Sequence, residues 1–151
     1  MDPQLAPPAG VRLVARASAC GTQNYECAAS PDAAGGFAWT FRGPEGMLGA
    51  EDGSWFGRHF ARDGAPAWLA ADGSFVVGKK VASVPSPSAG AVPWLLLQVT
   101  ATGGTGKLNA ATYVQRTDTN GGAMPTTGCD AGSAGAVKKV PYTADYWFFG
   151  R

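Results

Sequence analysis

Residues 52–83, DGSWFGRHFARDGAPAWLAADGSFVVGKKVAS, contain the pattern that decides the fold. Three short runs that favour strands, Trp55–Phe60, Ala67–Ala70 and Ser74–Ser83, are separated by glycine, proline and aspartate. Asp72-Gly73, between the last two runs, is typical of a hairpin turn. Helices of ordinary length do not fit between such breakers, whereas strands of about 5–6 residues do. The stretch therefore predicts strands joined by tight turns.

Residues that interrupt helices and strands occur throughout the chain, which has 22 glycines and 11 prolines among its 151 residues. Asp52-Gly53 is a second turn signal, and Ser83–Gly90 and Asn120–Ala136 are predicted loops. The other predicted strands are Val11–Arg16, Gln23–Ala29, Gly36–Arg42, Val92–Thr100, Lys107–Asp118 with a break near Asn109, and Val137–Phe149. We expect an all-β single domain, an antiparallel β-sandwich or β-barrel of about 8–9 strands, over residues 11–151. Residues 1–10 are predicted to be an extended, proline-rich leader.

Charge and hydropathy exclude two classes of partner. Lysine and arginine number 12 against 11 acidic residues, so no strong positive field exists to attract nucleic acid. The most apolar stretch, Ala91–Val99, is too short to span a bilayer as a helix and contains Pro93. The low charge and the many glycine, serine, threonine and aromatic residues are typical of exported proteins. We expect a secreted or periplasmic protein whose signal peptide is not in this chain, and the sequence indicates no oligomeric state.

Motifs for cofactors are incomplete. Residues 103–107, GGTGK, lack the first glycine of a phosphate-binding loop and the serine or threonine that follows its lysine. No G-x-G-x-x-G opens a helix after a strand, and no G-x-S-x-G elbow is present. Cys20, Cys27 and Cys129 lack metal-site spacing and leave room for one disulfide and one spare thiol. We expect no cofactor and no metal, and we assign no catalytic residue.

A ligand-binding site is predicted around His59, Trp55, Trp68 and Asp72. The two indoles flank the histidine segment next to turns rich in glycine and aspartate, where they would offer stacking area to a small molecule or a glycan. His59 and Asp72 would add directed hydrogen bonds. His59 is also the only histidine, and a lone histidine is often a structural, hydrogen-bonded residue.

Two other functions stay open. In the first, the protein is an enzyme with His59 as general base, oriented by Asp63 or Asp72. In the second, it is a structural or surface-interaction protein without a pocket, in which the aromatic residues are core and exposed strand edges pair with a partner. A concave site would favour binding, and a buried His–Asp pair beside a cleft would favour catalysis.

Nine short segments of the chain form an ordered series: Gly21–Cys27, Gly57–His59, Gly64–Trp68, Asp72–Ser74, Trp94-Leu95, Val114–Thr117, Gly121–Pro125, Gly128-Cys129 and Pro141–Tyr146. This series resembles the DUF3455 family, uncharacterised secreted proteins of fungi and bacteria. The series spans about residues 11 to 149. The resemblance implies export and a single domain and supplies no established activity. Some fungal members carry a malate dehydrogenase label, which the absence of a dinucleotide-binding motif does not support here.

Matching residues individually adds two expectations. Cys27 and Cys129 stand at the family's Tyr-x-Cys and Gly-Cys positions, so the resemblance implies a Cys27–Cys129 disulfide, with Cys20–Cys27 as the competing pair. An unpaired Cys20 would depart from the family pattern. His59, Trp68, Asp72 and Ser74 match a family segment in which a histidine precedes a Gly-Pro-x-Trp turn and an Asp-Gly-Ser turn. Here Ala65 separates Gly64 from Pro66, which puts a fixed catalytic geometry in doubt.

Overall fold

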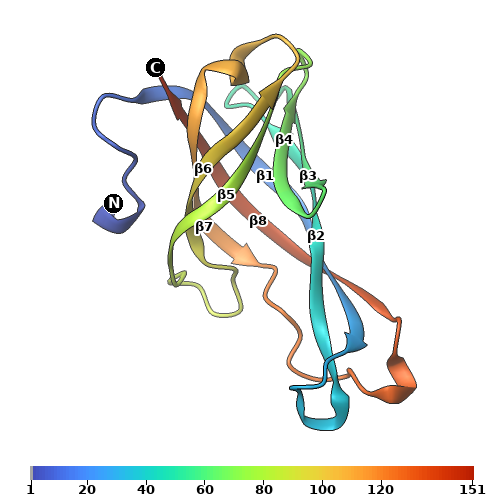
Figure 1. Cartoon of the computed structure of the whole chain (residues 1–151). Helices are drawn as coiled ribbons and strands as arrows, with labels where there is room; N and C mark the ends of the chain where they lie inside the picture. Colours follow the sequence, from blue (N-terminus) through green and yellow to red (C-terminus); the bar gives the residue numbers. More distant parts are fainter. Residues whose placement is uncertain (1) are drawn as a thin grey trace.

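The computed structural model describes residues 2–151 and shows an eight-stranded antiparallel barrel that is fully closed (Figure 1). Each strand pairs with the next one in sequence, and β1 pairs with β8 to complete the circle. The strands are β1 (Arg12–Ala29), β2 (Phe37–Gly49), β3 (Trp55–Arg62), β4 (Ala65–Ala70), β5 (Phe75–Val84), β6 (Trp94–Gly103), β7 (Ala111–Gly121) and β8 (Val137–Gly150). The all-β prediction is confirmed, and of the two predicted architectures, β-sandwich and β-barrel, the protein has the β-barrel.

The helical segments are short 3-10 turns, η1 (Pro3–Leu5), η2 (Ala34–Gly36), η3 (Lys107–Ala110) and η4 (Ala131–Ser133). Turn η3 is the break predicted near Asn109, and the strands predicted at 11–16 and 23–29 are one continuous strand, β1. No helix of residues 2–151 is long and apolar enough to cross a membrane.

The two predicted Asp-Gly turns are confirmed as hairpin turns. Gly53 joins β2 to β3 and Gly73 joins β4 to β5, with φ of 85° and 92°. Glycine adopts this left-handed conformation without a steric penalty. In each turn the aspartate Oδ1 accepts hydrogen bonds from the serine two residues later, Ser54 or Ser74.

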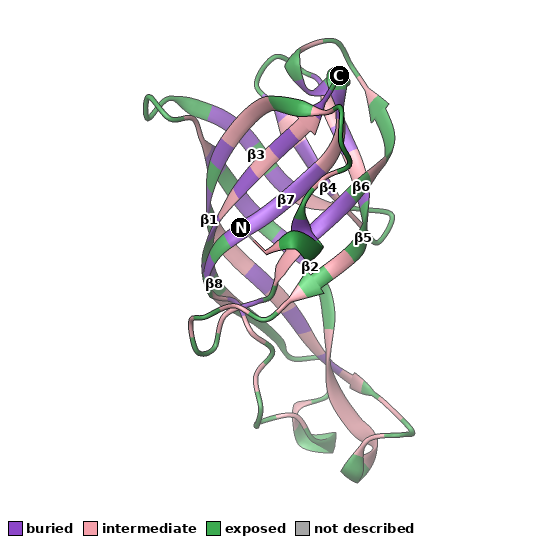
Figure 2. Ribbon diagram, turned by 90° about the vertical axis from the view of Figure 1, so that its left-hand side faces the viewer, coloured by how far each residue is buried: buried purple, intermediate pink, exposed green. Residues whose placement is uncertain are grey.

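Buried side chains alternate with exposed ones along the strands, so the core lies inside the barrel (Figure 2). The fully buried Leu108 of η3 lies at the end of the barrel where β6 passes into β7. Outside the barrel, the first segment of the chain packs against the wall. Leu5 is completely buried there, and its carbonyl accepts a hydrogen bond of 2.9 Å from Gln115 Nε2. Met1 of the predicted leader lies outside the described residues.

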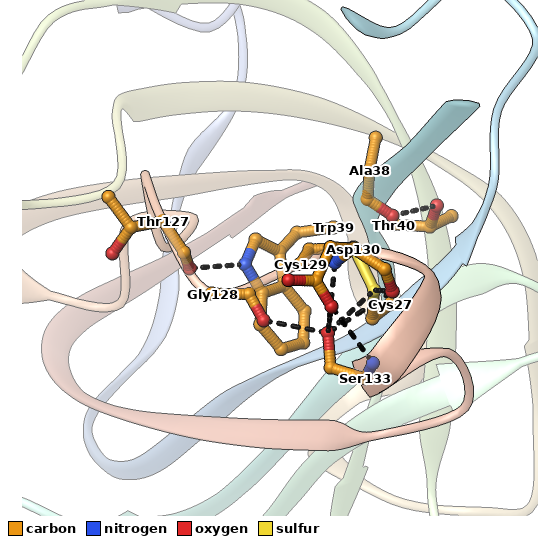
Figure 3. The surroundings of a disulfide bond; sticks show 9 residues. All are labelled: Cys27, Ala38, Trp39, Thr40, Thr127, Gly128, Cys129, Asp130 and Ser133. Carbon is orange, nitrogen blue, oxygen red and sulfur yellow. Dashed lines mark hydrogen bonds between the residues drawn. A yellow bond between two sulfur atoms is a disulfide. The ribbon is translucent and has the colours of Figure 1, made fainter. Parts of the chain in front are cut away.

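At the opposite end, β1 and β2 project beyond the barrel as a long hairpin (Figure 1). The Cys27–Cys129 disulfide joins this hairpin to the segment between β7 and β8 (Figure 3). A hydrogen bond of 2.8 Å from Trp39 Nε1 to the Thr127 carbonyl supports the same junction. The disulfide predicted from the resemblance is confirmed, and Cys20 is exposed and unpaired.

Candidate functional site

A cavity of about 560 Å³ opens at the end of the barrel from which the β1–β2 hairpin projects, and all eight strands line it. Its walls are mainly apolar, from Phe41, Pro44, Pro66, Trp68, Leu95 and Leu97. The polar groups among its lining residues include Gln23, Tyr25, His59, Arg116 and Tyr146. Closed barrels of eight strands have room inside for core side chains or for one small ligand. This size and mixture are typical of small-molecule sites.

His59 and Trp68 lie in this cavity as a stacked pair. They face each other across β3 and β4, with ring centroids 4.6 Å apart and planes 11° from parallel. Tyr146 of β8 contacts both rings, at centroid distances of 5.0 Å from His59 and 5.5 Å from Trp68. Two of the predicted site residues are therefore brought together.

The His59 ring is held in one tautomer. Its Nδ1 lies 2.7 Å from the Ala67 carbonyl oxygen, and because a carbonyl only accepts hydrogen bonds, Nδ1 carries the proton. Nε2 is then an acceptor. Desolvation by burial lowers the pKa of His59 from 6.5 to about 3, and the nearby positive charge of Arg116 adds to this lowering. The ring is therefore neutral at all ordinary pH.

The orienting carboxylate that a general base would use does not contact His59. Asp63 is exposed at the tip of the β3–β4 hairpin with φ of 51°, next to Gly64. Asp72 lies in the β4–β5 turn at the opposite end of the barrel. No ion pair among residues 2–151 includes His59. A neutral imidazole with a pKa of about 3 is also a weak base, so the residues around it do not form a His–Asp pair.

Asp72 closes the far end of the barrel. Its Oδ1 accepts from the Ser74 hydroxyl at 2.6 Å, and its Oδ2 accepts from the Lys107 backbone N–H at 2.8 Å. The Ser74 hydroxyl accepts from the backbone N–H of Leu108 at 3.1 Å. Hydrogen bonds to the Asp72 carboxylate lower its pKa to about 2, and the bond from the Ser74 hydroxyl makes the largest contribution. Asp72 thus fixes η3 onto the β4–β5 turn, away from the cavity.

Trp55 lies outside the barrel, 60% exposed. In a regular strand, residues four apart share a face, so Trp55 and His59 would point the same way. A β-bulge in β3 changes this, because Gly49 pairs with Trp55 while the adjacent Leu48 pairs with Gly57. The extra residue, Phe56, turns inward and is 4% exposed. Because side chains alternate between the two faces of a strand, one added residue moves the side chains that precede it to the opposite face. Trp55 therefore lies on the outer face of the barrel, whereas His59 lies on the inner face.

Arg116 was not predicted as a site residue. Its position on β7 places it between Leu95 of β6 and Tyr146 of β8, and it is 9% exposed. Its Nε donates to the Pro93 carbonyl at 3.0 Å. Within residues 2–151, no ion pair includes Arg116. The cavity therefore contains a buried guanidinium without a carboxylate partner.

Two residues that line the cavity also have a side-chain N–H group without a hydrogen-bond partner among the described residues. The groups are Gln23 Nε2 and Trp68 Nε1, on side chains that are 2% and 1% exposed. Buried polar groups are almost always paired, so unpaired ones at a cavity indicate a ligand or ordered water. Gln23, Arg116 and Tyr146 all stand in segments that carry the family resemblance, which was the one available signal for them.

These features define the protein as a closed eight-stranded barrel with an internal cavity. Among residues 2–151, no three histidine, cysteine, aspartate or glutamate side chains are grouped so that they could hold a metal ion. A family model described as "Protein of unknown function (DUF3455)" matches residues 7–150, and the chain belongs to that family. No curated protein and no solved structure matches the chain.

Proposed function

We propose that this protein binds a small molecule inside the barrel. The observation that carries the proposal is the cavity of about 560 Å³, whose lining residues include Gln23 and Trp68 with buried N–H groups that have no partner in the described chain. A buried donor without a partner carries a desolvation penalty, which a bound hydrogen-bond acceptor would remove.

The walls favour an apolar molecule over a glycan. A sugar ring needs hydrogen-bond partners for most of its hydroxyl groups, whereas this cavity offers few polar groups among many apolar ones. The opening has the same character, since Phe41 and Met124 at the cavity are each 49% exposed. Such side chains are costly to leave in water and suit the entry of an apolar ligand.

We further propose that the protein is exported. The Cys27–Cys129 disulfide supports this, because disulfides persist in oxidising compartments. The disulfide is consistent with an extracellular location. A barrel that holds a small apolar molecule in such a compartment would act as a carrier or a store.

A matched pair of substitutions tests the site. Trp68→Phe removes the indole N–H inside the cavity, and Trp55→Phe makes the same change on the exposed outer surface. Titration with the neutral fluorescent probe 1-aminoanthracene should give saturable binding to one site in the wild type and in Trp55→Phe. Ala61→Phe, which places a ring among the cavity-lining residues, should abolish it.

The folded state of each variant is checked by circular dichroism and thermal melting. Trp68→Phe should keep the apolar wall and bind more weakly any ligand that accepts from the indole. Equal probe binding by Ala61→Phe and the wild type, with both folded, would place the probe outside the barrel and refute the proposal.

A further inference from the structure

Arg116 is the one buried lysine or arginine among residues 2–151. The ion pairs of the described chain involve Arg16, Arg42 and Lys139, whose side chains are all at least one third exposed. Charged side chains are rarely buried without a partner, since the surrounding protein does not replace the hydration they lose. The position of Arg116 therefore calls for an anion that the chain itself does not supply.

The groups around Arg116 do not supply that charge. Its positive charge acts on Tyr25, His59, Tyr142 and Tyr146. Burial is the main effect on the three phenols and raises their pKa values, so they stay neutral, and burial keeps His59 neutral too. The phenols have hydrogen-bond partners of their own. Tyr142 and Tyr146 bond to each other at 3.2 Å, Tyr146 also bonds to the Arg116 side chain, and Tyr25 donates to the Gly122 carbonyl.

The unpaired groups of the cavity share one chemical character. Gln23 Nε2 and Trp68 Nε1 are both hydrogen-bond donors, and the guanidinium of Arg116 has only donors. Arginine binds a carboxylate through two parallel N–H···O bonds. One buried positive charge matches one negative charge, whereas a phosphate monoester carries about −1.5 to −2 near neutral pH and would leave an excess.

Building on the proposed function, we infer that the ligand is an apolar molecule with a single carboxylate, which Arg116 binds inside the barrel. The apolar part lies along the walls formed by Trp68, Leu95 and Leu97. The carboxylate accepts from the guanidinium, and the free amide N–H of Gln23 is available as a further donor. Lys80, exposed at the cavity, adds positive charge on the approach to the opening.

The test uses three ligands with the same chain and different head groups, titrated by calorimetry into the full-length protein. Decanoate should bind with one site, decan-1-ol should bind about 10- to 100-fold more weakly, and decyltrimethylammonium should not bind measurably. Arg116→Met should reduce decanoate affinity by about 10- to 100-fold and leave decan-1-ol affinity unchanged or higher. The matched control Arg58→Met removes an exposed arginine that stacks on Phe60 outside the barrel and should leave all three affinities unchanged.

The comparison of head groups on the wild type requires no variant, so the inference is testable even if Arg116→Met does not fold. Equal affinity of the wild type for decanoate and decan-1-ol would overturn the inference while supporting a cavity that binds apolar molecules. Retained decanoate selectivity in a folded Arg116→Met would also overturn it, by placing the anion elsewhere. Failure of all three ligands, together with failure of 1-aminoanthracene, would overturn both the inference and the proposed function.

Discussion

Acid should destabilise the folded protein through its single histidine, and His59→Phe should remove that part of the pH dependence. Phenylalanine keeps a ring against Trp68, where the centroids of the native pair are 4.6 Å apart. The substitution loses the hydrogen bond to the Ala67 carbonyl, which lowers stability by about 1 kcal/mol at every pH. What distinguishes the variant is therefore the slope of its stability with pH.

The magnitude follows from the two pKa values of His59, 6.5 in an unperturbed chain and about 3 in the folded protein. Below 6.5 the unfolded chain takes up a proton that the folded chain does not, so stability is complete above pH 6.5 and falls as the pH drops towards 3. The slope approaches about 1.4 kcal/mol per pH unit, which gives a loss of about 2.5 kcal/mol between pH 7 and pH 4.5. The result changes little if the folded pKa is anywhere below about 4.

Urea unfolding of wild type and His59→Phe at a series of pH values between 7 and 4.5 measures this directly. Carboxylates titrate alike in both proteins, so the difference between the two free energies of unfolding isolates His59. The wild type should lose about 2.5 kcal/mol relative to the variant over that range. Proton NMR provides a second readout, because the chain has one histidine and its Cε1–H signal should not shift in the folded protein. A constant difference in stability, with the signal titrating near pH 6.5, would refute the reasoning and show that water in the cavity hydrates the ring.

Two further predictions concern the ends of the barrel. Replacing Cys27 and Cys129 together by alanine should lower the free energy of unfolding by about 4–5 kcal/mol, because the bridge closes a loop with a sequence separation of 102 residues. Urea unfolding measures this, and Cys20→Ser, at an exposed unpaired position, is the control expected within about 0.5 kcal/mol of the wild type. Asp72→Ala should lower stability by about 1–2 kcal/mol through its lost bonds to the β4–β5 turn and η3, without changing ligand affinity. A selective loss of affinity in folded Asp72→Ala would return that residue to the binding site.

The candidate site shows where a sequence pattern stops being informative. His59 and Trp68 were predicted to share a site, and they do lie together, because they face each other across the β3–β4 hairpin. Trp55 was included because it flanks the His59 segment in sequence, but the bulge at Phe56 puts it on the opposite face. Gly64 and Asp72 are each four residues from Trp68, but they lie at opposite ends of β4. Asp72 is therefore at the end of the barrel away from the cavity. Sequence proximity does not reveal which end of a strand a residue occupies relative to a cavity.

Arg116 illustrates a different limit. In sequence it is one more arginine in a strand, and its neighbours give no indication that it lies inside. Its burial, the absence of a carboxylate partner in the described chain and its proximity to Tyr25 and Tyr146 result from strands far apart in sequence meeting around one axis. These are the features on which the anion inference depends.

The sequence by itself determined the strand class, the turns and the single domain, because glycine, proline and aspartate act locally on the backbone and alternation acts over a few residues. With the family resemblance, it also indicated the disulfide. Only the tertiary structure decided that β1 pairs with β8, since closure requires contacts between residues more than a hundred positions apart. Closure creates the inside of the barrel, and the identity of the side chains that meet there, with their burial and missing partners, is a property of that enclosed space.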